Sequence, residues 1–398
     1  MSTRQMRICV TMAGCSRLQG GLFHSVRQLW LGVHRLGHQV EVKAVEDAYS
    51  EEDCSQYAPL NVKLTRCIGP QRLSYSPQLV EYLQAQGGQH DVLSSHGLWS
   101  YADYAAWKAS KFLNIPHIIH PHGMVDGWAL KNSSLKKRVS RWVFQGNALR
   151  SSACLRALTT AEADSLRRFG CKGPIAVLPN GIAIDSLQNA TCEKTRQSIQ
   201  ALTNGQPYVI FLSRIHPKKN LKALLAAWKL LRSTVKNELL VLAGPDELGH
   251  GNELREFIQQ HDLQNVLFTG PLYGAAKAEW LRQCKLLVLP SLSEGFPVVL
   301  LEAAAMKKPV LMTPACYYPQ LAEAGGAVIS GTSPMELADA LTQLMKLPSS
   351  DLKRMGECGY KLVAKEHTWE SISGKMAELC QALIEKRELP GFVETVKN

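Results

Sequence analysis

Short apolar runs alternate along the chain with longer stretches in which apolar residues recur every three or four positions. The short runs predict β-strands and the longer periodic stretches predict amphipathic helices. In the first half, the predicted strands are Arg7–Thr11, Gln39–Val45, Asp91–Ser94, His117–His120, Cys154–Thr159 and Ile175–Leu178. Strands that alternate with helices of this length predict βαβ units around a parallel sheet.

The stretch Leu22–Leu36 shows the helical pattern most clearly. Val26, Leu29 and Val33 fall on one face, and Gly37 follows as a helix-ending glycine. Further helices are predicted in this half over residues 101–112 and 135–149.

The same alternation restarts near Tyr208. The predicted strands are Tyr208–Leu212, Leu239–Ala243, Val266–Phe268, Leu286–Leu289, Val310–Met312 and Ala327–Ile329. The predicted helices are Leu221–Ser233, Asn252–His261, Ala275–Gln283, Val298–Met306, Pro334–Lys346 and a final amphipathic helix, Thr368–Ile384. The residues after about 389 are expected to be frayed. The fold class is therefore α/β, with two doubly wound parallel-sheet domains that meet across a ligand-binding cleft.

Composition supports a globular protein: of the 398 residues, 45% are hydrophobic and 20% are charged. The eleven cysteines include no Cys-x-x-Cys pair and no cluster with zinc spacing, so no structural metal is expected. The apolar run near the N-terminus, Ile8–Ala13, is too short for a signal-peptide core. We therefore expect a cytoplasmic protein.

The net charge of +11 is unevenly distributed. Residues 131–156 contain seven basic residues and no acidic residue, with Trp142 and Phe144 among them. Such a segment could bind an anionic membrane surface, or it could be an ordinary solvated helix face. No nucleic-acid-binding signature accompanies it, so no nucleic-acid partner is expected.

The strongest candidate site is the stretch from Ser291 to Ala303, which follows a predicted strand. A polar turn with Gly295 leads to Pro297, which is expected to open a helix whose free N–H groups favour phosphate. Glu294 lies in the turn and Glu302 on the helix, among Val, Leu and Ala. A carboxylate on such a buried helix needs a partner, and sugar or ribose hydroxyls would supply one.

Two further loops carry phosphate-binding features. Arg214 and Lys219 follow the strand Tyr208–Leu212 and could hold a diphosphate, although a basic loop without function would look the same. Gly20-Gly21 lets the backbone approach a ligand closely, but the pair lacks the glycine fingerprint of a dinucleotide site.

Two histidine-bearing segments also follow predicted strands: His96-Gly97-Leu98-Trp99 and His120-Pro121-His122-Gly123. A histidine beside glycine in a loop can act in catalysis or can simply be a hydrogen-bonded polar residue. A zinc site formed by these histidines would lack a fourth ligand.

Together these features resemble the family-4 retaining glycosyltransferases of the GT-B fold, which are also called group 1 glycosyltransferases. The resemblance spans nearly the whole chain. Its most specific parts are Arg214 with Lys219, and two glutamates, Glu294 and Glu302, flanked by Gly-Phe and Glu-Ala. The stretch from Gly123-Met124 to Trp128 is similar to bacterial transferases that build surface polysaccharides.

The resemblance implies two facing Rossmann-like domains: an acceptor domain, 1–185, and a nucleotide-sugar donor domain, 186–368. A C-terminal helix, 369–388, would return to the first domain. It also implies hexosyl transfer with retention, from a nucleotide-sugar to a glycan or lipid-linked acceptor, without a metal or other cofactor. The protein would work in the cytoplasm, as a peripheral protein on the membrane's inner face if 131–156 binds lipid.

The resemblance also assigns site residues. Arg214 and Lys219 would neutralise the diphosphate, and Glu294 would contact the transferred sugar. These three and His122, beside the reacting centre, form the implied catalytic group. The implied donor-binding group is Gly20, Gly21, Phe296 and Glu302, with Glu302 on the ribose, and His96 would lie on the acceptor side.

Three alternatives stay open. A nucleotide-sugar epimerase of similar fold would need an acid pair in the cleft. A dinucleotide-dependent oxidoreductase is disfavoured by the missing glycine fingerprint. A catalytically silent nucleotide-sugar-binding subunit would keep the binding residues and lack turnover.

Overall fold

The computed structural model describes residues 4–85, 89–125, 145–231, 235, 237–246 and 248–396. The chain forms two compact units: residues 1–181 with 369–398, and residues 182–368. The first boundary falls at residue 181, where 185 was expected, and everything from Trp369 onward belongs to the first unit.

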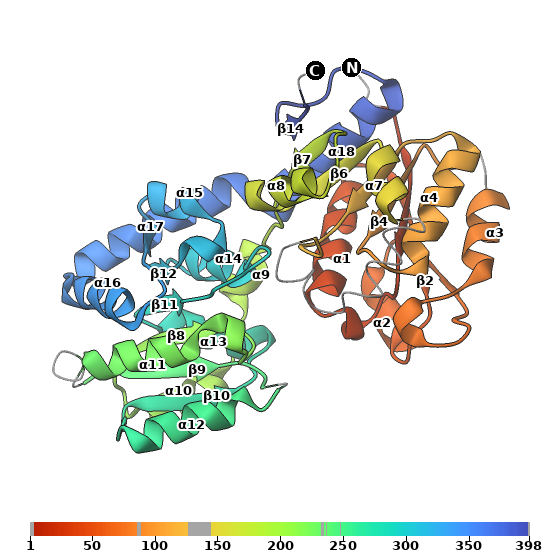
Figure 1. Cartoon of the computed structure of the whole chain (residues 1–398). Coiled ribbons are helices and arrows are strands. Elements are labelled where there is room, and N and C mark those ends of the chain that lie inside the picture. The colour runs from red at the N-terminus through yellow and green to blue at the C-terminus, as the bar shows by residue number, and fades with distance from the viewer. Residues whose placement is uncertain are drawn as a thin grey trace. The chain divides into compact units, whose positions relative to one another are not determined.

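The first unit is built on one eight-stranded sheet with the order β14-β7-β6-β5-β4-β1-β2-β3 (Figure 1). Its strands are β1 (Arg7–Met12), β2 (Gln39–Val45), β3 (Asn61–Thr65), β4 (Val92–His96), β5 (His117–His120), β6 (Cys154–Ala157), β7 (Ile175–Val177) and β14 (Val393–Glu394). All pairings are parallel except the one between β14 and β7. The order reverses between β1 and β4, and the loops after these two strands form the switch point of a doubly wound sheet.

Helices cover both faces of this sheet. They are α1 (Gly21–Arg35), α2 (Ser50–Asp53), α3 (Pro77–Ala85), α4 (Tyr101–Leu113), α7 (Gly146–Ser151), α8 (Thr160–Arg168) and α18 (Trp369–Glu385), with short 3-10 turns η1 (Arg17–Gln19), η2 (Cys54–Tyr57) and η3 (Gln71–Leu73). On one face, α1 packs against α18, and a core of Leu29, Trp30 and Met376 forms between them and the sheet. On the other face, α3 packs against α4.

The second unit holds a six-stranded, wholly parallel sheet with the order β10-β9-β8-β11-β12-β13. Its strands are β8 (Tyr208–Leu212), β9 (Leu239–Ala243), β10 (Val266–Gly270), β11 (Leu286–Leu289), β12 (Val310–Met312) and β13 (Ala327–Ile329). Here the order reverses between β8 and β11, so the loops after these two strands form the second switch point.

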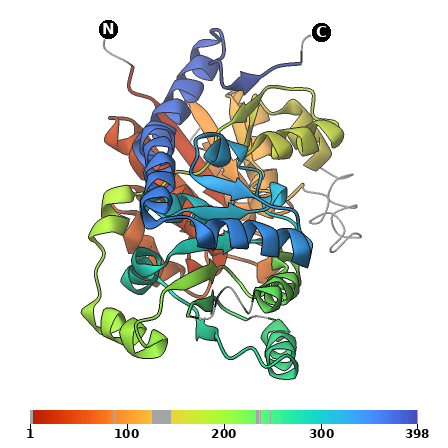
Figure 2. The ribbon, with the colours of Figure 1, turned by 90° about the vertical axis from the view of Figure 1, so that its left-hand side faces the viewer.

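Helices also flank this sheet, and Figure 2 gives a second view of them. They are α9 (Ile184–Asn189), α10 (Glu193–Thr203), α11 (Leu221–Leu230), α12 (His250–Gln260), α13 (Gly274–Gln283), α14 (Val298–Ala305), α15 (Pro319–Glu323), α16 (Pro334–Lys346) and α17 (Ser349–Glu366), with the 3-10 turns η5 (Pro217–Lys219) and η6 (Pro314–Cys316). One layer contains α11, α12 and α16, and another contains α9, α14 and α17.

The prediction of two doubly wound parallel-sheet domains is confirmed. The expectation of a frayed C-terminus is wrong for Val393 and Glu394, which pair with Ala176 and Ile175 of β7. Most of the helix predicted over 135–149 lies outside the described residues. No helix in the described part of the chain combines the length and the apolar character needed to cross a bilayer.

Candidate active site

In the second unit, the two loops at the switch point carry three of the predicted catalytic residues. Arg214 and Lys219 follow β8, and Glu294 follows β11, the neighbouring strand. Because β8 and β11 are parallel, their carboxyl ends lie at the same edge of the sheet, and both loops project there. The Lys218 carbonyl accepts the Leu292 N–H at 2.8 Å, which joins the two loops directly.

The centre of this site is a buried ion pair between Lys219 and Glu294. The Lys219 ammonium contacts Glu294 Oε1, and both residues are less than a tenth exposed. Ser291 Oγ donates to the same Oε1 at 2.6 Å. Thr313 Oγ1 in turn donates to the Ser291 carbonyl at 2.5 Å. The carboxylate is thus held in one orientation from two sides.

Local backbone features set the shape of the loop after β8. His216 caps η5 by accepting the Lys218 N–H at 3.1 Å. Asn220 adopts φ +59° and turns the chain into α11, which asparagine tolerates better than most residues. Its side chain donates to the Thr332 carbonyl at 2.8 Å. Arg214 is exposed at the start of the loop.

Glu302 lies on α14, where the neighbouring residues are buried. The predicted need for a partner is met by Lys277 of α13, whose Nζ donates to Glu302 Oε1 at 2.5 Å. Lys277 was not predicted as that partner, because it lies on another helix, α13. Pro297 was expected to be the first residue of the helix, but it is the N-cap of α14, which begins at Val298.

Phe296, in the turn before α14, belongs to an aromatic group. Its ring lies 6.2 Å from the His367 ring at an angle of 21°, and 5.7 Å from the Tyr318 ring at 72°. Tyr318 and His367 are both buried. The ring of Phe296 is therefore fixed by contacts within the second unit.

In the first unit, the loop between β1 and α1 carries Gly20 and Gly21. Gly20 adopts φ +55° and ψ −126°, a conformation for which only glycine is suited. Gly21 is the first residue of α1. Apart from its chain neighbours and the nearby backbone of its own helix, no atom of the described residues lies within 4 Å of where its Cβ would be. The N-terminus of this 15-residue helix is a suitable geometry for an anion.

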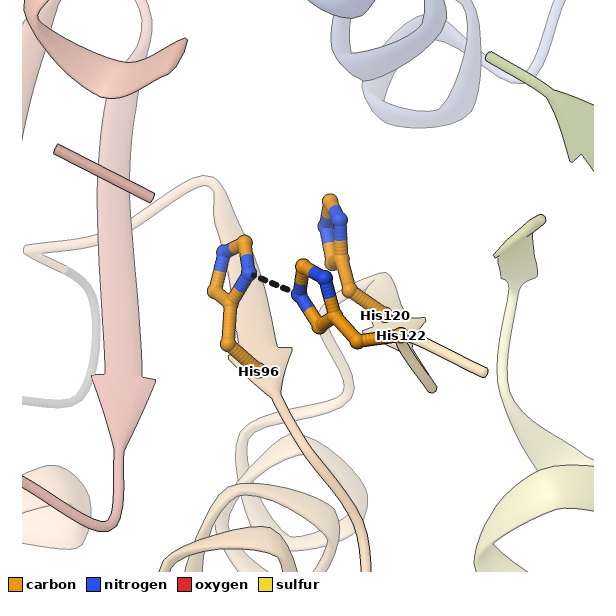
Figure 3. Close-up of side chains that lie close together, drawn as sticks. All are labelled: His96, His120 and His122. Carbon is orange, nitrogen blue, oxygen red and sulfur yellow. Dashed lines mark hydrogen bonds between the residues drawn. The ribbon is translucent and has the colours of Figure 1, made fainter. Parts of the chain in front are cut away.

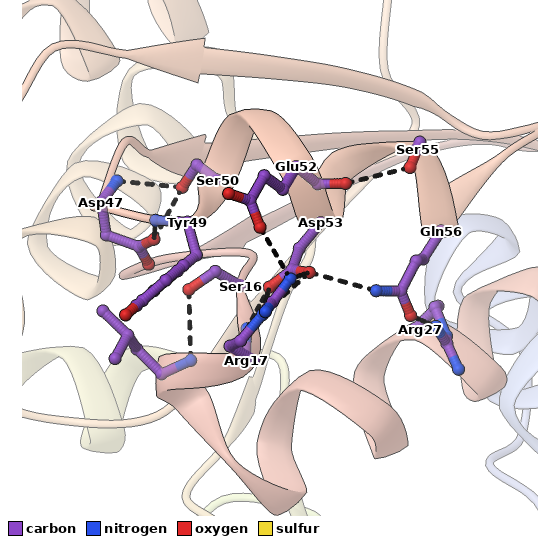
Figure 4. A network of polar contacts seen from close by, with 11 residues as sticks. Ser16, Arg17, Arg27, Asp47, Tyr49, Ser50, Glu52, Asp53, Ser55 and Gln56 are labelled. Atoms are coloured by element: carbon purple, nitrogen blue, oxygen red, sulfur yellow. Dashed lines mark hydrogen bonds and ion pairs between the residues drawn. The ribbon is translucent and has the colours of Figure 1, made fainter.

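A polar network fixes the segment just before these glycines (Figure 4). The Arg17 N–H donates to Asp53 Oδ2 at 2.8 Å, and its guanidinium contacts Asp53 Oδ1 at 2.7 Å and Glu52 Oε2 at 3.0 Å. Arg17 lowers the pKa of Asp53 to about 2. Ser16 Oγ also accepts the Leu18 N–H at 3.2 Å. Sequence reasoning did not identify this network, since Arg17 and Asp53 are 36 residues apart.

Three histidines gather at the carboxyl ends of β4 and β5 (Figure 3). His96 Nδ1 lies 3.0 Å from His122 Nε2, and the His96 and His120 rings stack with centroids 4.0 Å apart. Burial lowers the pKa of all three, that of His122 to about 3. His122 has φ +53°, which is uncommon for a residue with a side chain.

His96 is 1% exposed, and both of its ring nitrogens face other side chains: Nε2 accepts the Trp30 Nε1–H at 2.8 Å, and Nδ1 faces His122. The prediction that His96 lies on the acceptor side is untested. Its burial disfavours direct contact with an acceptor.

These three histidines are also the group in the described part of the chain that could hold a metal ion. Each offers one ring nitrogen, and these atoms lie within 4.8 Å of one another. The set lacks a fourth ligand for tetrahedral zinc. The expectation that no metal is needed stays a prediction.

Part of the basic segment 131–156 lies outside the described residues. Within the described part, Arg150 is exposed, but Arg156 is 1% exposed. The Arg156 guanidinium donates to the carbonyls of Leu178 (2.8 Å) and Pro179 (2.6 Å). The inclusion of Arg156 in a lipid-facing surface is therefore wrong.

Comparisons with known proteins agree with this two-unit α/β fold. The family described as Glycosyl transferases group 1 matches residues 193–362, within the second unit. The family described as Glycosyl transferase 4-like domain matches residues 20–181, within the first. D-inositol 3-phosphate glycosyltransferase of Jonesia denitrificans is 26% identical over 82% of this chain and 79% of its own length. A second such enzyme, from Catenulispora acidiphila, is 27% identical over 75% of this chain and 72% of its own.

Solved structures show the same fold at low identity. Anabaena HepE in complex with UDP and glucose is 18% identical, with a TM-score of 0.74 over 94% of this chain and 99% of that one. WaaG, a glycosyltransferase involved in lipopolysaccharide biosynthesis, is 17% identical, with a TM-score of 0.66 over 94% and 99%. With its two parallel-sheet units and both family matches, the chain belongs to the group 1 glycosyltransferases and has the GT-B fold.

Proposed function

We propose that this protein transfers a hexosyl group, with retention of configuration, from a nucleotide-sugar to a glycan or lipid-linked acceptor, in surface polysaccharide biosynthesis. The observation that carries the proposal is the buried Lys219–Glu294 pair at the switch point of the second sheet, beside exposed Arg214. This edge of a doubly wound sheet is where nucleotide ligands bind. A cation and an oriented carboxylate there suit a diphosphate and a sugar hydroxyl, respectively.

The chemistry follows from where charge develops. Cleavage of the sugar–phosphate bond leaves positive charge on the sugar ring and an additional negative charge on the departing diphosphate. Arg214 and Lys219 would stabilise that leaving group, which is the largest contribution expected from the protein. These cations and the helix N-termini would replace a metal ion.

The remaining donor contacts follow from the family resemblance and from where these residues lie in each unit. Glu302 would accept hydrogen bonds from the ribose hydroxyls, and Phe296 would lie against the donor. The backbone at Gly20 and Gly21 would approach the phosphates. His122, with its left-handed backbone and a ring held by His96, would contact the transferred sugar.

UDP-sugars are the first donors to test, because HepE was solved with UDP and with UDP-glucose. The inositol phosphate named for the curated relatives is a second acceptor class to test beside glycans. We place the activity in the cytoplasm, with residues 131–150 as the segment that would bind the inner membrane face.

Epimerisation is the main alternative, since a putative UDP-N-acetylglucosamine 2-epimerase from Listeria monocytogenes shares the fold at a TM-score of 0.63. Transfer is favoured because both family matches are to glycosyl transferases. A silent binding subunit is the other alternative, and any turnover would exclude it.

The test is incubation with UDP-glucose, UDP-N-acetylglucosamine and GDP-mannose, each with and without added acceptor. Release of nucleoside diphosphate is measured, and the anomer of the product is read by proton NMR before mutarotation. We expect release from one donor and an α-anomeric product. Release with a β-anomeric product would contradict retention, and a 2-epimeric nucleotide-sugar would identify an epimerase.

A further inference from the structure

The hydrogen bond between Trp30 and His96 has a fixed direction. Trp30, on α1, is buried, and its indole Nε1–H lies 2.8 Å from His96 Nε2. An indole nitrogen can only donate. His96 Nε2 must therefore accept, which means that it carries no proton.

This direction determines the state of the next ring. A neutral imidazole with a bare Nε2 carries its proton on Nδ1. His96 Nδ1 lies 3.0 Å from His122 Nε2, so His96 donates and His122 accepts. A neutral His122 must then carry its own proton on Nδ1. Burial, next to the Arg156 guanidinium, keeps both rings neutral by lowering their pKa values.

A second contact holds the backbone that carries His122. Glu162, on α8, accepts the Gly123 N–H with Oε1 at 2.5 Å and the Leu158 N–H with Oε2 at 2.7 Å. One carboxylate thus links the loop after β5 to the end of β6. His122 (φ +53°) and Gly123 (φ +77°) both have left-handed backbone conformations, and the hydrogen bond from Gly123 to Glu162 helps to hold them.

We propose that Trp30 and His96 are positioning residues, which fix the orientation of the His122 ring and hold its proton on Nδ1. The role in transfer rests on the proposed function, in which His122 contacts the donor sugar. A fixed Nδ1–H would then present a single hydrogen-bond donor to a sugar hydroxyl, with no tautomer change needed on binding. A site held in advance in this way favours the transition state.

The same hydrogen bond disfavours a metal ion at these histidines. A metal on His96 Nδ1 would require a neutral ring with its proton on Nε2. That proton would point at the Trp30 N–H, and two donors would face each other. Zinc binding and the proposed tautomer therefore exclude each other, so zinc serves as a test.

The direct measurement is long-range proton–nitrogen NMR on protein labelled with ¹⁵N-histidine, which distinguishes the two imidazole tautomers without any substrate. We expect His96 and His122 to be Nδ1–H tautomers in the wild type, and His122 to become a mixture in Trp30→Phe. A Trp107→Phe variant is the matched control, because the Trp107 indole donates instead to Ser151 Oγ at 3.0 Å. We expect that control to leave both histidines unchanged.

Two substitutions of His96 separate its hydrogen bonds. The amide of His96→Asn places its NH₂ near the position of Nδ1, so it can still donate to His122. The amide of His96→Gln reaches the position of Nε2, so it can face only Trp30. We expect the His122 tautomer to survive in His96→Asn and to be lost in His96→Gln.

In donor turnover, Trp30→Phe and His96→Gln should lower kcat by about tenfold, with KM for the donor nearly unchanged. His96→Asn should restore most of that loss. An Nε2–H tautomer at His122 in the wild type would overturn the proposal, as would stoichiometric zinc binding by His96 or a Trp30→Phe variant with unchanged spectra and kcat. If the tautomers are as expected but no nucleotide-sugar is turned over, the positioning stands and the proposed function fails.

Discussion

At the scale of single residues, the Lys219–Glu294 pair is the feature that most needs an explanation. Both side chains are less than a tenth exposed, and removing two charges from water costs free energy that their mutual attraction repays only with good geometry. Ser291 and Thr313 supply that geometry through hydrogen bonds. Under the proposed function, donor binding explains this costly pair, whereas stability does not.

Arg214 provides the first residue-level prediction. Because the charge on the leaving diphosphate grows in the transition state, Arg214→Ala should lower kcat by about 10²–10³-fold. The dissociation constant of the intact nucleotide-sugar donor should change much less, since its diphosphate carries less charge than the leaving group in the transition state. Lys222→Ala is the matched control: Lys222 is an exposed cation of the same unit, paired with Glu253 on its surface. Equal losses of affinity and turnover in Arg214→Ala would contradict the assignment.

At the scale of elements, the loop from β1 to α1 combines rigidity with close access. Arg17 and Asp53 fix its start, and Gly20 takes a backbone conformation closed to other residues. In the part of the chain that the structure describes, Gly21 leaves open space at the helix N-terminus. The two glycines therefore have different roles, and substitution should separate them.

Gly20→Ala should lower the free energy of unfolding by about 1–3 kcal/mol, because its backbone is strained for alanine. Gly21→Ala should leave stability nearly unchanged, since the added Cβ would meet no neighbouring side chain within 4 Å among the described residues, yet it should weaken nucleotide binding. Chemical denaturation and calorimetry measure the two effects. A Gly21→Ala variant with normal nucleotide affinity would count against a phosphate at this backbone.

The buried histidines on β4 and β5 and in the loop after β5 should make the stability of the protein depend on pH. Burial holds the pKa of His96 and His120 well below the ordinary value, and lowers that of His117 and His122 to about 3. Below about pH 6.5 the unfolded histidines bind protons and the folded ones do not, so the stability that they contribute is lost as pH falls from there toward about 3. Burial raises the pKa of Asp103 to about 8. The stability that this protonated carboxyl group contributes is lost as pH rises through that value, which is opposite to the effect of the histidines.

Four histidines outweigh one aspartate, so the melting temperature of the first unit should fall between pH 7 and pH 5. Asp103→Asn removes the opposing group and should steepen that fall. A melting temperature that rises on acidification would show that these histidines are not buried in the neutral form.

The same elements show how far sequence reasoning reached. Strands with continuous apolar runs, such as β8 and β11, were predicted at their observed bounds, because fully buried parallel strands have a strong signal. The strand β3 was missed, since its residues are mostly exposed or half-buried at the sheet edge. Trp30 lies within the helix predicted over 22–36, and nothing local marks its hydrogen bond to His96, 66 residues away.

At the scale of the whole molecule, the excess positive charge lies mostly in the first half. Residues 1–185 hold 21 of the 45 basic residues but only 13 of the 34 acidic ones. Lipid contact would depend on this charge, and each basic residue near an anionic surface contributes about 1 kcal/mol.

Reversing Lys131, Lys136, Lys137, Arg138 and Arg141 to Glu should therefore abolish co-sedimentation with vesicles that contain phosphatidylglycerol. Equal reversal of Lys346, Lys353, Arg354, Lys361 and Lys365 in the second unit is the control. Binding that survives the first reversal, or that is lost equally in the second, would refute a role for this segment.

The most direct test of the central claim is calorimetric titration of wild type and Glu302→Gln with UDP, GDP and ADP. Glu238→Gln serves as the control, because Glu238 is also paired with a lysine in the second unit, Lys285. We predict that one nucleotide, UDP first, binds the wild type and the control but binds Glu302→Gln much more weakly. Binding of none of the three, or equal binding by Glu302→Gln, would contradict a nucleotide-sugar site at the β8 and β11 loops.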